Sequence, residues 1–379
     1  MPYVTRTTRG WGSPSRYVQG PGEVKNLQKY THIYGDKVLA IIDPFFFADL
    51  SASLKAIYEE AGDKFTAIEF KGEVTVKNIE ATCEESKDFA PNVVVGIGGG
   101  KTLDTAKAVA YQNNAAMVIV PTSASTDAPT SALSVVYKDN GEHSHAIYYH
   151  KNPDLIVADS EIIAKAPIRF LVSGMGDALS TVFEARANDA SDTANYIWFE
   201  QTGGFRRCKT ALSVAELCYD TVIEKGFLAK QAAEKGIVTE ALEDIIEANT
   251  LMSGLGFENT GCAGAHSVGD GITALPEGAK TLHGEKVAFG VICQLVAENA
   301  PEDLIEEVAM FCVRVGLPIT LKDLGIDEVT DEKLHIIAKA SLNSFWSAQP
   351  FNVTEDMIIN YIIQRDTIGE YYKKVAEEE

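Results

Sequence analysis

Asp177, His266 and His283 have side chains suited to metal chemistry, and each stands among small residues near a predicted helix. Two imidazoles and a carboxylate can form a catalytic zinc set whose fourth position stays open for a substrate. The long separations along the chain are uninformative by themselves. Hydrogen-bonded histidines and a helix N-cap aspartate are therefore the simpler alternative on the residues alone.

A run of glycines suggests a second kind of chemistry. Four glycines stand between residues 96 and 100, after three valines at 93–95 and before a helical pattern. A strand, a glycine turn and a helix N-terminus present free backbone N–H groups to a phosphate. Lys101 breaks the G-x-G-x-x-G pattern, and Val95 stands where a P-loop needs its first glycine. The run predicts a nucleotide or dinucleotide site, and a tight turn that needs glycine only for its geometry is the alternative.

The segment 121–132 is rich in hydroxyl groups and contains Asp127. It follows a predicted strand, so it should lie at the carboxyl edge of the sheet, where ligands bind. Hydroxyls and a carboxylate at that edge suit a polyhydroxy ligand or a cofactor. An ordinary loop remains open as the alternative, because these residue types are common in turns.

The elements that must position these groups change character near the middle of the chain. Predicted strands cover 38–42, 65–70, 93–95, 117–120 and 155–158, and predicted helices cover 50–61 and 76–89. After Pro167 long helical patterns dominate, at 210–224, 239–251, 284–297 and 303–315. We expect a mostly parallel, Rossmann-like α/β dinucleotide-binding domain over 1–165, then an all-helical metal- and substrate-binding domain over 166–379. The crevice between them is the expected ligand site.

Composition narrows the class of protein. The 379-residue chain has a net charge of −21, which argues against nucleic acid and anionic membranes as partners. Its six cysteines form no C-x-x-C motif and are expected to be reduced thiols. No apolar run approaches the ~20 residues of a membrane span. These features favour a cytoplasmic enzyme.

Three longer motifs resemble one family. They are Gly-Gly-Gly-Lys-Thr-Leu-Asp-Thr-Ala-Lys at 98–107, Ser-Thr-Asp-Ala-Pro-Thr-Ser-Ala-Leu-Ser-Val at 125–135 and His-Gly-Glu-Lys-Val-Ala-Phe-Gly at 283–290. Together they resemble the metal-dependent (iron-type) alcohol dehydrogenases, in particular the members that oxidise glycerol. That family shares the dehydroquinate-synthase-like fold. Shorter matches at 17–20, 183–186 and 247–250 extend the resemblance over nearly the whole chain.

The resemblance implies roles for individual residues. It implies that Asp177, His266 and His283 hold one catalytic zinc per subunit, and that Asp127, also catalytic, contacts the substrate beside the metal. It implies that NAD is the cofactor, with the glycine turn at its pyrophosphate and Asp43 at its adenosine ribose. The implied NAD contacts are Asp43, Gly98, Gly99, Gly100, Lys101, Thr102, Thr122, Ser125, Ser131, Leu133 and Tyr137.

One departure from the family pattern bears on the metal. Iron-dependent members carry a histidine one helical turn after the aspartate, and here that position is Thr181. Three protein ligands with an open position suit zinc, and losing the fourth nitrogen disfavours iron. We therefore expect Zn²⁺.

Other departures concern the pocket wall. Asp270 replaces a histidine that many members have one turn after His266, and the segments 195–205 and 342–349 differ from the usual pattern. None of these changes removes an expected ligand. They leave the preferred polyol undecided.

The implied reaction is reversible oxidation of glycerol to dihydroxyacetone with NAD. Small polyols, namely glycerol, 1,2-diols and dihydroxyacetone, are the expected partners, and the resemblance implies a homo-oligomer, expected to be an octamer. Another vicinal diol dehydrogenase on the same scaffold is the nearest alternative. A dehydroquinate-synthase-type lyase would need several basic residues around its substrate, and the sequence places no such cluster near Asp127, His266 or His283.

Overall fold

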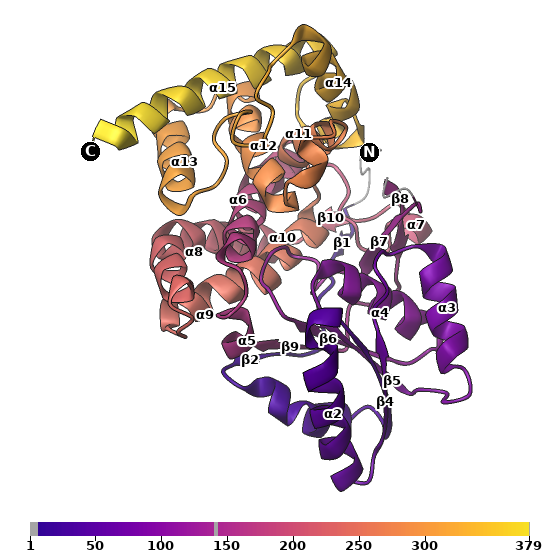
Figure 1. Cartoon of the computed structure of the whole chain (residues 1–379). Helices are drawn as coiled ribbons and strands as arrows, with labels where there is room; N and C mark the ends of the chain where they lie inside the picture. Colours follow the sequence, from indigo (N-terminus) through magenta and orange to yellow (C-terminus); the bar gives the residue numbers. More distant parts are fainter. Residues whose placement is uncertain (1–6, 140–142, 379) are drawn as a thin grey trace.

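A parallel sheet forms the centre of the first half of the chain (Figure 1). The computed structural model describes residues 7–139 and 143–378. The six-stranded sheet has the order β2-β9-β6-β5-β3-β4, and every pair in it is parallel. Its strands are β2 (Tyr17–Gly20), β3 (Lys37–Ile42), β4 (Lys64–Glu69), β5 (Val93–Gly98), β6 (Ala116–Pro121) and β9 (Leu155–Asp159). The predicted mostly parallel sheet is confirmed.

Helices cover both faces of this sheet, because its strands alternate apolar side chains between two cores. Leu39 and Ile41 of β3 belong to one buried cluster, and Val38 and Ile42 belong to the other. The elements between the strands are η1 (Glu23–Asn26), α1 (Leu27–Thr31), α2 (Pro44–Glu60), α3 (Val76–Ser86) and α4 (Gly100–Gln112), and α5 (Ser160–Ile163) follows the last strand. The central strands are buried on both sides, which explains their near-continuous apolar sequence.

Two local features differ from the sequence-based expectation. The helix predicted over 50–61 begins at Pro44, because the Asp43 side chain accepts the backbone N–H of Phe45 and proline suits the first helical position. An antiparallel hairpin of β7 (Leu133–Tyr137) and β8 (His143–Tyr148) also stands beside the sheet. Its strands of five and six residues were not among the predicted strands.

The second half is helical, as predicted, apart from β10 (Arg206–Arg207), which pairs with β1 (Arg9–Gly10). Its helices are α6 (Ile168–Ser191), α7 (Phe199–Thr202), α8 (Lys209–Glu234), α9 (Glu240–Glu247), η2 (Ala248–Met252), α10 (Ser253–Thr260), α11 (Gly264–Thr273), η3 (Gly278–Lys280), α12 (His283–Ala297), α13 (Glu302–Val315), α14 (Asp331–Ser341), η4 (Ser344–Ala348) and α15 (Glu355–Glu378). The boundary proposed near residue 165 falls between α5 and α6.

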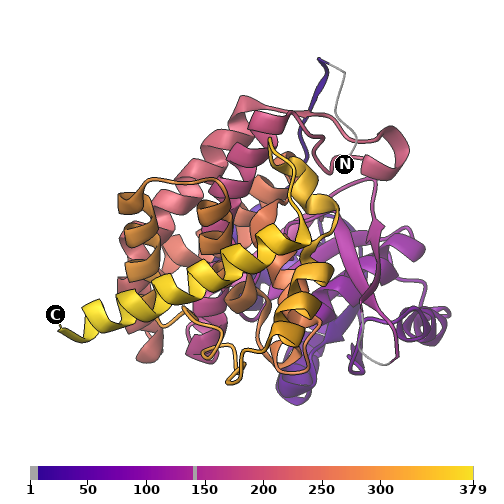
Figure 2. The ribbon, with the colours of Figure 1, turned by 90° about the horizontal axis from the view of Figure 1, so that it is seen from above.

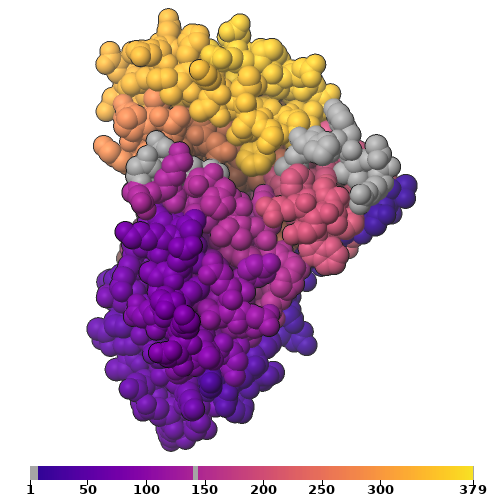
Figure 3. Space-filling view, turned by 90° about the vertical axis from the view of Figure 1, so that its right-hand side faces the viewer, coloured from indigo at the N-terminus to yellow at the C-terminus, as the bar shows by residue number. Residues whose placement is uncertain are grey.

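Helix α6 is the axis of the helical half and packs against α8, α10 and α12 (Figure 2). In the space-filling view the C-terminal helices, orange to yellow, form one mass across the end of the indigo to magenta α/β region (Figure 3). The atypical segment 195–205 joins the two regions. Trp198 Nε1 donates to the backbone carbonyl of His150 in the first half, and the backbone N–H of Tyr196 donates to the backbone carbonyl of Glu258 in α10. No helix within 7–139 and 143–378 is long and apolar enough to cross a membrane.

Candidate active site

The carboxyl ends of three neighbouring strands bring Asp43, Gly98 and Thr122 together. The N–H of Asp43 donates to the carbonyl of Ile97 at 2.8 Å, and the N–H of Thr122 donates to that of Gly98 at 3.0 Å. A Cβ atom on Gly98 would lie 2.7 Å from Thr102 Oγ1 and 3.0 Å from Asp43 Cβ. Gly98 therefore lacks a side chain because the turn packs tightly here.

The N-terminus of α4 is open beyond this turn. A Cβ atom on Gly99 would have no neighbour within 4 Å, so another backbone or a ligand can approach at that point. Helix α4 begins at Gly100, and the N–H groups of its first turn have no intrahelical acceptor. Lys101 pairs with Glu73 at 2.6 Å and lies over the ring of Tyr137. The turn and the start of α4 therefore have the geometry of an anion-binding site.

A buried lysine attaches the loop after β6 to α4. Lys107 Nζ donates to the carbonyl of Ala128 at 2.5 Å, the carbonyl of Leu133 at 3.0 Å and Ser131 Oγ at 3.2 Å, and it pairs with Asp104. The Ser131 hydroxyl is therefore buried in an internal contact, as is the Thr102 side chain beneath Gly98. Sequence reasoning missed this lysine, although Asp104 and Lys107, one turn apart beside the apolar run Ala108–Ala110, are the signal for a buried pair.

Asp177, His266 and His283 meet at one point from three helices, α6, α11 and α12. The Nε2 atoms of His266 and His283 are 3.3 Å apart, and each lies 3.5 Å from Asp177 Oδ1. Ligand atoms at ~2.0–2.1 Å from one tetrahedral zinc ion would be ~3.3–3.4 Å apart. Among the described residues, no donor satisfies Asp177 Oδ1, which is fully buried. An unpaired buried oxygen facing two imidazole nitrogens fits a metal ion.

Two glycines allow these helices to approach so closely. A Cβ atom on Gly284 would lie 1.8 Å from the carbonyl oxygen of Ser173, and one on Gly176 would lie 2.4 Å from that of Gly284. Helix α12 can therefore place His283, its first residue, directly beside Asp177 on α6. Glu285 fixes the start of α12 by accepting the N–H of Leu282 and pairing with Arg169.

Glu184 orients His266 from the buried side. It lies two helical turns after Asp177 on α6, and its Oε2 atom is 2.7 Å from His266 Nδ1. Its Oε1 atom accepts the N–H groups of Ala263 and His266. A carboxylate on Nδ1 directs the Nε2 lone pair toward the metal position and makes it more basic. Sequence reasoning quoted Glu184 within a family motif and gave it no role.

Asp127 joins the loop after β6 to the metal cluster. Its backbone N–H donates to Asp177 Oδ2 at 3.3 Å, and its own Oδ2 accepts from Ser253 Oγ at 3.2 Å. Asn249, in the π-helical turn η2, fixes the same loop by donating to the carbonyls of Ala124 and Leu171. Such turns often mark functional sites.

The two carboxyl groups of this site have opposite electrostatics. Burial and the nearby Asp177 charge hold the pKa of Asp127 well above its usual range. Burial also opposes ionisation of Asp177, but the charges of the adjacent His283 and His266 imidazoles outweigh it and hold the pKa of Asp177 below its usual range. A difference of this kind allows one carboxylate to bind a cation while the other exchanges hydrogen bonds with a substrate.

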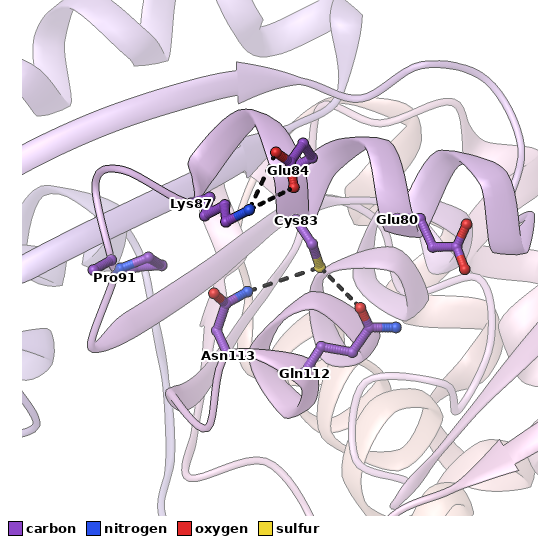
Figure 4. A pocket seen from close by; sticks show the side chains of 8 residues that line it. Glu80, Cys83, Glu84, Lys87, Pro91, Gln112 and Asn113 are labelled. Atoms are coloured by element: carbon purple, nitrogen blue, oxygen red, sulfur yellow. Dashed lines mark hydrogen bonds and ion pairs between the residues drawn. The ribbon is translucent and has the colours of Figure 1, made fainter.

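A separate surface pocket lies away from these residues (Figure 4). Glu80, Cys83, Glu84, Gln112 and Asn113 are among the residues that line it. It is at the C-terminal end of α4, whereas the glycine turn is at the N-terminal end, ~20 Å along the helix. Its side chains are paired with one another, as Cys83 is with Gln112 and Asn113, and no candidate site residue reaches it.

The fold and the site define a class: a two-part oxidoreductase with an α/β half that carries a phosphate-binding turn and a helical half that carries a metal cluster. Comparison with known proteins agrees with this class. Residues 14–160 match the iron-containing alcohol dehydrogenase family. Glycerol dehydrogenase of Citrobacter freundii is 44% identical over 363 residues, 95% of this chain and 98% of that protein.

Two further relatives cover the chain as fully. The solved structure of a probable glycerol dehydrogenase from Sinorhizobium meliloti superposes with a TM-score of 0.88 at 41% identity, over 96% of this chain and 99% of that one. Glycolaldehyde reductase of Halobacterium salinarum is 40% identical over 94% of this chain and 97% of that protein. The chain belongs to the iron-containing alcohol dehydrogenase family, with its dehydroquinate-synthase-like fold, and it is an oxidoreductase.

Proposed function

We propose that this chain is an NAD- and zinc-dependent glycerol dehydrogenase, which reversibly oxidises glycerol to dihydroxyacetone. The observation that supports this most is the cluster of Asp177, His266 and His283 with Asp127 beside it. Relatives named glycerol dehydrogenase at about this chain's full length favour the same substrate. The overall reaction converts glycerol and NAD⁺ into dihydroxyacetone, NADH and a proton.

Zinc is the proposed metal, although the family is named for iron. The donor set has three protein ligands, and the spacing of their atoms suits a tetrahedral ion. Thr181, one turn after Asp177, has no nitrogen to offer as a fourth ligand, and its hydroxyl is already bonded to Ser253. When bound, zinc would supply a Lewis acid that lowers the pKa of the reacting hydroxyl, and NAD would supply the hydride acceptor.

The proposed NAD site is the edge of the sheet formed by β3, β5 and β6. Free N–H groups at the start of α4 would face the pyrophosphate, and Gly99 leaves room for it. The Asp43 carboxylate, at the end of β3, would accept hydrogen bonds from the adenosine ribose. The other proposed NAD contacts are Lys101, Thr102, Thr122, Ser125, Ser131, Leu133 and Tyr137. The side chains of Thr102 and Ser131 are buried.

The proposed substrate residue is Asp127, which lies between the metal cluster and the cofactor edge. Its carboxyl group would exchange a hydrogen bond with a second hydroxyl of the polyol and so orient the carbon to be oxidised. A monoalcohol lacks this second hydroxyl. Leaving a buried hydrogen-bonding group without its partner costs roughly 1–3 kcal/mol, which corresponds to about five- to a hundred-and-fiftyfold in catalytic efficiency.

An NADH-absorbance assay tests this function. The enzyme is stripped with a chelator, then reloaded with Zn²⁺ or Fe²⁺, and assayed with glycerol, 1,2-propanediol, 2,3-butanediol, 1-propanol and dihydroxyacetone. We expect zinc to restore activity and glycerol or 1,2-propanediol to exceed 1-propanol. Restoration by iron alone would contradict the metal assignment. A lack of polyol oxidation with either metal would contradict the proposed function.

A reductase for a small hydroxyaldehyde is a second candidate, because the Halobacterium relative carries that name. It uses the same site in the reverse direction, so glycolaldehyde belongs in the same assay.

The cytosolic location and the homo-octamer remain predictions, and light scattering measures the assembly directly.

A further inference from the structure

Two buried hydroxyl groups connect the helices α6 and α10 to the Asp127 carboxyl group. Thr181 Oγ1 lies 3.1 Å from Ser253 Oγ, and Ser253 Oγ lies 3.2 Å from Asp127 Oδ2. Thr181 is 2% exposed and Ser253 is 0% exposed, so water does not compete for these contacts. Neither hydroxyl is a metal ligand or a proposed cofactor contact.

The direction of these two hydrogen bonds follows from counting protons. With the Asp127 carboxyl group either ionised or protonated on Oδ1, Ser253 donates its one hydroxyl proton to Asp127 Oδ2. The contact between Thr181 and Ser253 must then be donated by Thr181, since Ser253 can only accept there. The chain of hydrogen bonds therefore runs from Thr181 to Ser253 to Asp127.

This chain leaves one oxygen of Asp127 available. Oδ2 is taken by Ser253, and the backbone N–H of Asp127 is held by Asp177. Among residues 7–139 and 143–378, no hydrogen bond goes to Oδ1 of Asp127. Whether the carboxyl group is ionised or protonated, Oδ1 is thus the atom that can meet a substrate hydroxyl.

Close packing makes the arrangement rigid. A Cβ atom on Gly254 would lie 1.7 Å from Thr130 Oγ1, and one on Gly256 would lie 2.2 Å from the methyl carbon of Thr181. The two glycines let α10 approach both α6 and the loop that carries Asp127. The hydroxyl pair therefore has little freedom to turn away from the carboxyl group.

We propose that Thr181 and Ser253 are positioning residues that set the preference for vicinal diols over monoalcohols, by fixing Asp127 with Oδ1 toward the substrate. This inference rests on the proposed function, because it assumes that a second substrate hydroxyl meets Asp127. Without the hydroxyl pair the Asp127 carboxyl group can rotate, and its contact with the diol weakens. A monoalcohol makes no such contact, so kcat/KM for its oxidation should not change.

Three variants of the zinc-loaded enzyme test the proposal. Ser253→Ala removes the donor to Asp127. Thr181→Val removes the donor to Ser253 and keeps the shape, whereas Thr181→Ser keeps the hydroxyl and removes only the methyl group. The measured quantity is the ratio of kcat/KM for 1,2-propanediol to kcat/KM for 1-propanol, with NAD saturating.

We expect Ser253→Ala to lower this ratio by about tenfold, because it removes the hydrogen bond that holds the buried Asp127 carboxyl group in place. Thr181→Val should lower it by a smaller factor, and Thr181→Ser should keep the wild-type ratio. The glycerol dissociation constant of the zinc- and NADH-loaded enzyme, measured by calorimetry, should rise in parallel, with zinc content unchanged.

Thr260→Val is the matched control, because it removes another buried hydroxyl of α10 that bonds only to the carbonyls of Gly256 and Gly261. If Ser253→Ala and Thr181→Val lower kcat/KM equally for 1,2-propanediol and 1-propanol, or change neither value, the proposed positioning role is wrong. If the wild-type enzyme itself shows no diol preference, the proposed function fails instead.

Discussion

The Nε2 atoms of His266 and His283 lie 3.3 Å apart, although His266 lies in α11 and His283 is the first residue of α12. A proton on His283 Nε2 could be donated to His266 Nε2, but this contact alone would leave the buried Asp177 Oδ1 without a partner. A shared cation, also held by Asp177 Oδ1, accounts for the arrangement.

Asp177→Asn should weaken zinc binding by more than roughly tenfold, because a charged ligand is replaced by a neutral one. Zinc affinity is measured by competition with a chromophoric chelator, and zinc content by elemental analysis. Asp220→Asn, at an exposed position of α8, is the control and should bind zinc as the wild type does. Full activity of a demonstrably metal-free enzyme would rule out the metal site.

Glu184→Gln should lower zinc affinity by roughly ten- to a hundred-fold without removing a ligand. The amide can still accept a hydrogen bond from backbone N–H groups, but it no longer offers a charged acceptor to His266 Nδ1. The cobalt-substituted enzyme gives an independent measurement, because its absorption spectrum reports ligand geometry. Unchanged zinc affinity would reduce Glu184 to a packing residue.

Gly99→Ala should weaken NADH binding by roughly tenfold or more, which equals about 1.4 kcal/mol, with little change in Tm. The position has an ordinary φ of −83° and open space around its Cβ direction, so the methyl group disturbs only an approaching ligand. Gly98→Ala is the contrasting variant and should lower Tm, since its Cβ would meet Thr102 and Asp43. Equal NADH affinity of Gly99→Ala and wild type, by fluorescence titration, would contradict the pyrophosphate assignment.

The enzyme should prefer NAD to NADP. A 2′-phosphate about 4 Å from the Asp43 carboxylate would be repelled by up to ~4 kcal/mol before solvent screening. Because Asp43 is partly exposed, solvent screening reduces this repulsion. We expect kcat/KM with NAD to exceed kcat/KM with NADP by about thirtyfold. Asp43→Ser should narrow the ratio while preserving the cap of α2, since serine is also a good N-cap. Asp49→Ser, on the exposed side of α2, is the control, and comparable efficiency with NADP in the wild type would refute the assignment.

Stability should fall as pH rises from about 4.5 to about 7, through Glu258. Burial raises the pKa of Glu258 to about 7 from 4.5, against the opposing hydrogen bonds from Ala132 and Asn152. The folded state therefore holds this proton more tightly than the unfolded state, and that contribution is complete below pH 4.5 and lost above pH 7. At about 1.4 kcal/mol per unit, the loss is about 3 kcal/mol at most. Glu258→Gln should lack this component of the Tm-against-pH curve, and an identical curve for both proteins would contradict the prediction.

Much of the fold was predictable because its signals are local. The β3 and β5 strands are continuous apolar runs, and Asp43 with Pro44 marks a helix start, although its position was predicted six residues late. The pair β1–β10 was missed, because strands of two residues depend on a partner that is distant in the sequence.

The sequence by itself determined the identity of the chemical groups: a glycine turn before a helix, a hydroxyl-rich loop with Asp127, and three residues of metal-ligand type. Their meeting is a tertiary property. Only the packing of α6, α10, α11 and α12 at glycines such as Gly176 and Gly284 brings the cluster together, and only the fold places Glu184 behind His266 and Ser253 behind Asp127. The physical reason is that hydrogen bonds and ligand contacts act over about 3 Å, a distance that chain spacing does not encode.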